Sequence, residues 1–170
     1  MSVPAPPPNV VDRGPRPRAV TLGVILVLVL AALSLVSFVL TLANLDALVE
    51  ESIRQADTGD STPANVESIM RVWVIAVSTV TVLVAALVAV FALLALRGRN
   101  WARITVAVLM VLSAVFGLIS LAGGLVSPPE GLPGGYTATA TVIGVVQFLA
   151  ATGAAVLLLL SAAGNWYARR

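Results

Sequence analysis

VWVIAVSTVTVLVAALVAVFALLAL, residues 72–96, is the stretch of sequence that decides the fold. It contains fifteen Leu, Ile, Val or Phe residues and no charged residue. At roughly −0.3 to −0.6 kcal/mol for each of these residues, its insertion into a bilayer is favoured by about 4 to 9 kcal/mol. An open sheet cannot satisfy its edge in lipid, and barrel strands need strict alternation. The stretch is therefore predicted to cross the membrane as a helix.

Three further stretches have the same character. The chain of 170 residues is 59% hydrophobic and 11% charged, with a mean hydropathy of +1.02. Its apolar residues gather in blocks that each exceed the ~20 residues needed to span a bilayer. The blocks cover about residues 19–43, 72–96, 104–126 and 136–163. We therefore predict an all-α polytopic membrane protein, in which residues 19–170 form a four-helix transmembrane bundle.

The arginines predict the orientation of the spans. All ten basic residues are Arg, and eight of them fall in the N-terminal tail, the second connection and the C-terminal tail. An even number of spans places these three regions on one side, and the positive-inside bias makes that side the cytoplasm. Seven of the eight acidic residues then face outward. This arrangement predicts a multi-pass protein of the cell (plasma) membrane with cytoplasmic N- and C-termini.

The second connection, RGRNWARI at residues 97–104, has the composition of a membrane anchor. Gly98 is expected to take the left-handed conformation that ends a helix, and Trp101 to lie at headgroup depth. The arginines are expected to meet anionic lipid headgroups; a binding site for a cytoplasmic partner is the alternative. A similar series of Gly, Trp and Arg residues closes the fourth span. Two explanations of this similarity stay open, duplication of a helical hairpin and convergence. The candidate anchoring residues are Arg97, Arg99, Trp101, Arg103, Trp166, Arg169 and Arg170.

Small and amide side chains in the spans are candidates for helix packing. Small residues recur four positions apart in the second, third and fourth spans, a spacing that lets helices approach closely. Gln147 is the largest polar side chain in the spans, and its amide is expected to face another helix; part of a polar pathway is the alternative. The packing candidates are Ser113, Gly117, Gly144 and Gln147.

The segments outside the membrane differ from one another. Residues 1–18 are rich in Pro and Arg and are expected to form a disordered cytoplasmic tail before an uncleaved first span. The first helix is expected to continue to about Ala56 and the second to begin near Pro63, giving an outer helical hairpin over about residues 44–71. Ion pairs four residues apart are expected between Glu50 and Arg54 and between Glu67 and Arg71. The apolar stripes expected to face each other are Leu45, Leu48, Val49 and Ile53 on one helix and Val66, Ile69 and Met70 on the other.

The residue types that are missing limit the function. The chain has no Cys and no His, so thiolate and imidazole ligands for haem, iron–sulfur clusters or zinc are lacking, and no cofactor, metal site or catalytic residue is expected. The spans also lack the membrane carboxylate on which small multidrug transporters depend. We therefore expect no enzyme, but a non-enzymatic accessory, scaffold or interaction subunit of the cell envelope. A subunit of a small oligomeric transporter or channel is the alternative.

A family resemblance agrees with this class. The proline-rich basic tail, the four spans and the GRNWARI turn at residues 98–104 resemble uncharacterised small four-span membrane proteins of high-GC Gram-positive bacteria. The resemblance implies a location in the bacterial membrane and no mechanism. The expected partners are the lipid bilayer and its anionic headgroups, with a second copy of the chain or another membrane protein as further candidates. No nucleic-acid partner is expected.

Overall fold

The computed structural model describes residues 17–55, 63–126 and 131–159, and within these ranges it contains helices and no strand. The helices are α1 (Arg18–Ala43), α2 (Leu45–Gln55), α3 (Pro63–Leu96), α4 (Asn100–Val126) and α5 (Gly134–Leu159). Four of them, α1, α3, α4 and α5, are long and apolar enough to cross a membrane. At 1.5 Å per residue, even a helix of 26 residues is about 39 Å long, more than the ~30 Å hydrocarbon layer. The prediction of an all-α membrane protein with a four-helix bundle is confirmed.

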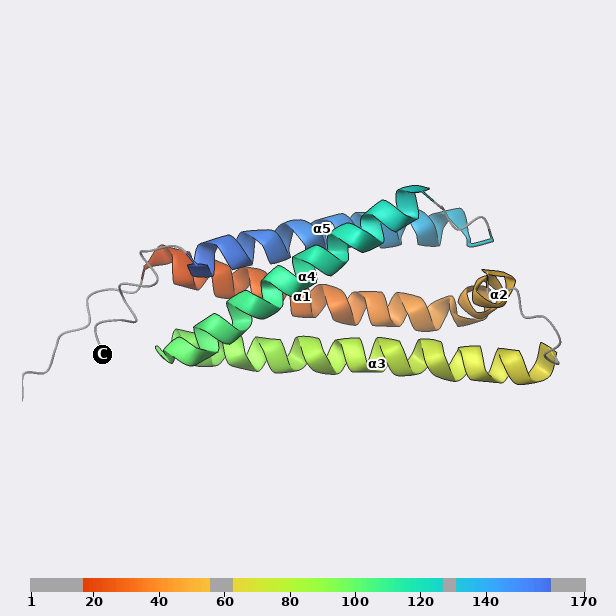
Figure 1. Cartoon of the computed structure of the whole chain (residues 1–170), viewed down its shortest axis with the longest axis horizontal. Helices are drawn as coiled ribbons and strands as arrows, with labels where there is room; N and C mark the ends of the chain where they lie inside the picture. The colour runs from red at the N-terminus through yellow and green to blue at the C-terminus, as the bar shows by residue number, and fades with distance from the viewer. Residues whose placement is uncertain (1–16, 56–62, 127–130, 160–170) are drawn as a thin grey trace, which may run out of the picture.

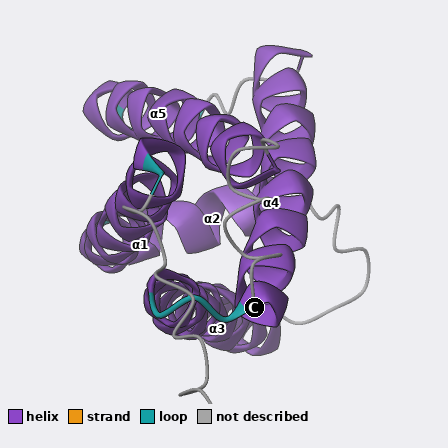
Figure 2. Ribbon diagram, turned by 90° about the vertical axis from the view of Figure 1, so that its left-hand side faces the viewer, coloured by secondary structure: helices purple, strands orange, loops and turns teal. Residues whose placement is uncertain are grey.

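The four long helices form a ring. Helix α1 packs against α3 and α5, and α4 packs against the same two helices from the other side. Figure 2, which looks along the bundle, shows the ring with α2 behind its middle. In Figure 1, α4 lies beside α3 at one end and crosses to α5 toward the other end. The short helix α2 therefore lies across one end of the ring of four helices.

Charged residues separate to the two ends of this bundle. One end, called here the arginine end, carries Arg18 at the start of α1, Arg97 and Arg99 between α3 and α4, and Arg103 in the first turn of α4. Figure 1 shows the start of α1 and the α3–α4 turn at the same end, with α2 at the opposite end. The opposite end, called the acidic end, carries Asp46, Glu50, Glu51, Arg54, Glu67 and Arg71. The separation of charge expected from the sequence is thus present in the fold.

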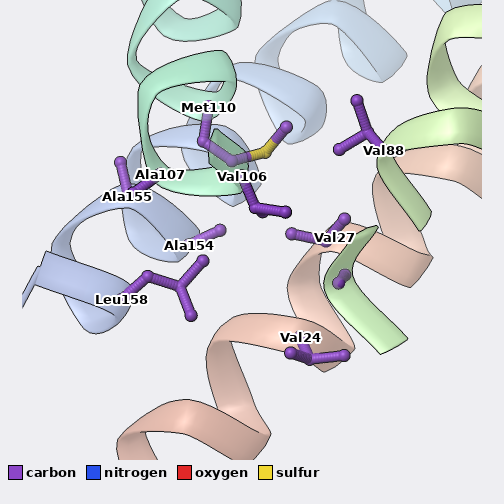
Figure 3. Close-up of a cluster of buried hydrophobic side chains, with 10 residues drawn as sticks. Val24, Val27, Val88, Val106, Ala107, Met110, Ala154, Ala155 and Leu158 are labelled. Atoms are coloured by element: carbon purple, nitrogen blue, oxygen red, sulfur yellow. The ribbon is translucent and has the colours of Figure 1, made fainter. Parts of the chain in front are cut away.

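The buried core occupies the half of the bundle next to the arginine end. Figure 3 shows side chains from α1, α3, α4 and α5 pointing toward one another there. Val27, Val106 and Leu158 are among the side chains that are at most 1% exposed. The full cluster consists of Val24, Val27, Val88, Ala92, Val106, Ala107, Met110, Ala154, Ala155 and Leu158. Six of these ten residues are Val, Leu or Met and the other four are alanines, so large and small side chains interlock.

The other half of the bundle has a different interior. In the described parts of residues 28–43, 67–87, 111–123 and 134–149, no residue is buried. Buried side chains reappear only at the acidic end, where Val49 of α2 and Val66 of α3 are covered. The fully buried side chains of the described spans are therefore concentrated next to the arginine end.

The sequence predicts a first helix that continues to about Ala56, and the structure shows that this prediction is wrong. It ends at Ala43, and Asn44 takes a non-helical conformation with φ −118° and ψ 23°. The Asn44 side-chain amide donates a hydrogen bond to the carbonyl of Leu40 at 2.9 Å, and the Asn44 backbone N–H donates to the same carbonyl at 3.1 Å. A side chain that bonds the preceding turn in this way competes with regular helix continuation. Helix α2 therefore starts afresh at Leu45 in a new direction.

The other predicted boundaries differ by a few residues. Helix α4 begins at Asn100 and not at Ile104, so Trp101 and Arg103 belong to its first turn. Helix α5 begins at Gly134, two residues before the predicted Tyr136. The second helix begins at Pro63, as predicted. The proline-rich tail up to residue 16 and the predicted end of the fourth span beyond residue 159 lie outside the described residues.

Candidate functional site

The turn between α3 and α4 closes the arginine end with a defined helix-ending motif. The Gly98 N–H donates to the Ala95 carbonyl at 2.9 Å, and the Arg99 N–H donates to the Leu94 carbonyl at 3.4 Å. This pair of bonds is the Schellman arrangement, which needs a residue with positive φ just beyond the helix. Gly98 has a φ of 81°, and glycine takes this conformation without steric cost. The expectation that Gly98 ends the second long helix is confirmed.

The aromatic and basic side chains of this turn lie close together. Trp101 is half exposed and makes an edge-to-face contact with Phe91 of α3, with ring centroids 5.7 Å apart and an interplanar angle of 74°. Arg97 and Arg99 are exposed, while Arg103 is half-buried. An indole held against the bundle beside exposed guanidinium groups matches the chemistry of a lipid headgroup region. The other predicted anchoring residues, Trp166, Arg169 and Arg170, lie outside the described part of the chain.

The predicted packing residues are only partly brought together. Gly117 of α4 faces Phe148 of α5, where an added Cβ would come 3.7 Å from the Phe148 Cβ. Gly144 of α5 faces Leu121 of α4, with a corresponding distance of 3.6 Å. These two glycines therefore lie on the α4–α5 contact. Ser113, by contrast, is exposed on α4.

Gln147 occupies an intermediate position on α5. Its side chain is half-buried, and it forms no hydrogen bond with another residue that the structure describes. The interhelical hydrogen bond expected for its amide thus has no partner within these ranges of the chain. Its role in helix packing stays a prediction.

Two glycines that the sequence reasoning missed make a close contact between α1 and α5. A Cβ added to Gly23 of α1 would lie 3.0 Å from Leu158 of α5, and one added to Gly153 of α5 would lie 3.1 Å from Leu26 of α1. Each glycine therefore receives a leucine from the opposite helix. The sequence feature that could have identified them is a glycine inside a span. Glycine destabilises the middle of a helix by roughly 0.5–1 kcal/mol relative to alanine, so its presence there indicates close packing that compensates.

Ion pairs tie α2 to its surroundings at the acidic end. Arg71 of α3 contacts Asp46 of α2 at 2.8 Å, and it contacts Glu67 one turn earlier in α3 at 3.3 Å. The predicted Glu67–Arg71 pair is confirmed. Arg54 pairs with Glu51 at 2.7 Å, so the predicted Glu50–Arg54 pair is wrong. The difference follows from the position of Glu51, which is buried beside Arg54, whereas Glu50 points to the exposed face.

The segment before α5 covers the Glu51 side chain. Glu51 is only 6% exposed, and its carboxylate lies so close to Gly131 that an added Cβ would collide with it. Val49, in the same helix, is 2% exposed. Of the residues expected to face α2 from α3, Val66 is buried, but Ile69 is 64% exposed. Helices α2 and α3 are thus in contact with Val49 and Val66 buried, whereas Ile69 does not take part in the predicted apolar contact.

The interior of the spans offers little polar chemistry. Several hydroxyl groups donate to a carbonyl of their own helix, as Ser34 does to Leu30 at 3.0 Å and Thr152 does to Phe148 at 2.9 Å. Among the described residues, no group of three or more Asp, Glu, His or Cys side chains could hold a metal ion. No known protein family, curated protein or solved structure matches the chain.

Proposed function

We propose that this protein is a non-enzymatic subunit of the cell (plasma) membrane that acts by binding other membrane or envelope proteins. One observation carries this proposal: every charged side chain in the described residues lies at one of the two ends of the bundle. Charged groups inside a membrane usually mark ion or proton pathways. A bundle whose charge is confined to its ends instead presents two polar surfaces on either side of an apolar body.

The proposed orientation places the arginine end in the cytoplasm. Arg97, Arg99 and Trp101 then meet the anionic headgroups of the inner leaflet, where each basic residue contributes about 1 kcal/mol of attraction. The acidic end faces outward, with Asp46 and Glu50 exposed on α2. A partner in the envelope that carries basic side chains is the kind of protein that this surface fits.

The orientation is tested by labelling single cysteines, because the native chain contains none. Arg99→Cys and Glu50→Cys place one thiol at each end of the bundle. In intact cells, an impermeant maleimide is expected to label Cys at position 50 and to label Cys at position 99 only after permeabilisation. Labelling of position 99 from outside would contradict the proposed orientation.

The interaction role is tested by photo-crosslinking in living cells. A photoreactive amino acid at Glu50, on the exposed face of α2, is expected to capture a discrete envelope protein that mass spectrometry identifies. The same amino acid at Leu83, which is exposed on the lipid-facing surface of α3, is the matched control. If position 50 yields only the products seen at position 83, the acidic end binds no partner.

The alternative function, a subunit of an oligomeric transporter or channel, has support from two polar residues. Ser113 is exposed, and Gln147 lacks a hydrogen-bond partner within the described parts of the chain. Both side chains are available to line a path between copies. A discrete oligomer in nanodiscs whose copies cross-link through Ser113→Cys would favour this alternative over the accessory role.

A further inference from the structure

We propose that α2 is a latch across the acidic end, and that the acidic half of the bundle opens about the packed arginine half when this latch releases. The inference goes beyond partner binding, because it concerns a conformational change within the chain itself. It rests on three features: the uneven distribution of buried residues, the position of α2, and the polar contacts that hold α2 in place.

The uneven packing supplies a hinge. The core cluster joins all four spans within about the last two to three turns before the arginine end, where Val24, Ala92 and Leu158 are at most 1% exposed. Farther along, Val66 at the acidic end of α3 is the next buried residue among the described parts of the spans. Between lipid-exposed helices, association depends on close packing and not on the exclusion of water. The arginine half is therefore joined by a buried core, whereas in the acidic half the glycine contacts lie between α4 and α5 and do not join these helices to α1 and α3.

The position of α2 makes it the element that bridges the separable helices. Figure 1 shows α1 and α3 side by side, with α4 and α5 together at the acidic end and α2 between the two pairs. Figure 2 shows α2 crossing behind the middle of the ring. Helix α2 contacts α3 directly, and its Glu51 is covered by Gly131, which leads into α5. Helix α2 thus packs on α3 and lies against the residue that leads into α5.

The contacts of α2 are of a kind that can release without unfolding the bundle. The Asp46–Arg71 pair joins α2 to α3, and the Asp46 side chain is 87% exposed. Exposed ion pairs contribute little and weaken as salt screens them. The break at Asn44 separates α2 from α1, so α2 can move without bending a continuous helix. The buried Val49 and Glu51 side chains also hold α2, so its release uncovers these two residues while the core at the arginine end stays packed.

Spin-label distance measurements on the full chain in nanodiscs test the latch. One label pair, Ile69→Cys with Ala138→Cys, reports the separation of α3 and α5 at the acidic end. A second pair, Leu93→Cys with Val156→Cys, reports the same two helices at the arginine end. All four positions are exposed. In each pair, the latch variants are Asp46→Asn and Asp46→Lys, the second of which places a cation against Arg71.

The expected result is a change at one end only. Asp46→Asn should raise the ratio of long to short acidic-end distances about 1.5- to 5-fold, the range for loss of an exposed ion pair, and Asp46→Lys should raise it further. The arginine-end distances should stay as in the unsubstituted pair. Glu67→Gln is the matched control, because it removes a contact of Arg71 that lies within α3 and should leave both distances unchanged. Raising the salt concentration from 0.01 to 1 M should mimic Asp46→Asn in the native sequence and have little effect in Asp46→Asn itself.

Three results would overturn the proposal. Unchanged acidic-end distances in Asp46→Lys and at high salt would show that the Asp46–Arg71 ion pair does not hold the bundle closed. An equal change at both ends would replace a hinged opening with loosening of the whole bundle. An effect of Glu67→Gln as large as that of Asp46→Asn would show that the contact between α2 and α3 has no special role.

Discussion

The two halves of the bundle differ in how closely their small residues let the helices approach. In the arginine half, Ala92, Ala107 and Ala154 lie in one cluster with larger side chains between them, and Gly23 receives Leu158 at the distance of closest approach. In the acidic half, Gly117 faces Phe148 and Gly144 faces Leu121 at ordinary contact distances. Glycines in both halves therefore accommodate a large side chain, but the approach is closer in the arginine half. The described residues form a buried core cluster only in that half.

This difference shows what holds a membrane bundle together. Lipid is as apolar as a leucine side chain, so burying a leucine in the protein gains nothing from leaving water. Only the closeness of the packing distinguishes a protein contact from a lipid contact. The acidic half has polar contacts instead at its end, where Arg71 reaches both Asp46 and Glu67.

The largest effect is expected for removal of a large side chain from the packed half. Leu158→Ala should lower the free energy of unfolding by about 2 kcal/mol or more, because Leu158 is fully buried and its loss leaves a cavity. The matched substitution Leu83→Ala, at a position 63% exposed, should cost less than about 0.5 kcal/mol. Reversible unfolding in mixed micelles measures both. Equal losses would show that the two halves do not differ in packing.

A smaller effect is expected when a methyl group is added to the glycines of the two halves. Gly23→Ala should destabilise the bundle by about 1 kcal/mol, because the added Cβ would meet Leu158 at 3.0 Å. Gly144→Ala should be neutral or stabilise by up to about 1 kcal/mol, since its neighbour lies at 3.6 Å and alanine favours a helix. Thermal denaturation in detergent compares the two variants. If Gly144→Ala lowers the thermal stability more than Gly23→Ala does, the expected difference between the two halves is wrong.

Much of the fold could be predicted from the sequence because the membrane leaves few choices. A charge-free stretch such as residues 72–96 must cross as a helix, and Gly98 followed by arginines marks the end of that helix. The break at Asn44 could not be predicted in the same way. It depends on a side-chain amide that reaches the Leu40 carbonyl, and an asparagine is also compatible with a continuous helix.

The candidate sites were harder to predict than the spans. Gly117 and Gly144 were found by their spacing with other small residues, and both lie on the α4–α5 contact. Gly23 and Gly153 were missed because their partners are leucines on another helix, which no spacing within one helix reveals. Likewise, the spacing allows Arg54 to pair with an acidic residue either three or four positions earlier. Only the burial of Glu51 shows that the pair is the one three positions apart.

Substitution of Gln147 tests whether its amide packs within the chain or between copies of the chain. Its half-buried amide has no hydrogen-bond partner among the described residues, so Gln147→Leu should leave the stability of the monomer unchanged or raise it by up to about 1 kcal/mol. Where the amide pairs with another copy, the same substitution should weaken the oligomer by about 0.6 kcal/mol or more. Unfolding of the monomer and a dilution series in micelles separate the two effects. A clear loss of monomer stability would place the partner of Gln147 within the chain.

The smallest effect concerns the ion pair that joins α2 to α3. A double-mutant cycle with Asp46→Asn and Arg71→Gln should give a coupling energy of about 0.2–1 kcal/mol, because both side chains are largely or partly exposed. Amide hydrogen exchange within Leu45–Gln55 measures this energy as the stability of α2 against local opening. The same amides should exchange faster at high salt in the native sequence, since screening weakens an exposed pair. Amides of α4 around Val106, in the packed half, should exchange at unchanged rates in every variant, because the core there makes no contact that depends on this pair. Faster exchange around Val106 would mean that the polar contacts at the acidic end also stabilise the packed half, and the two halves would then be one cooperative unit.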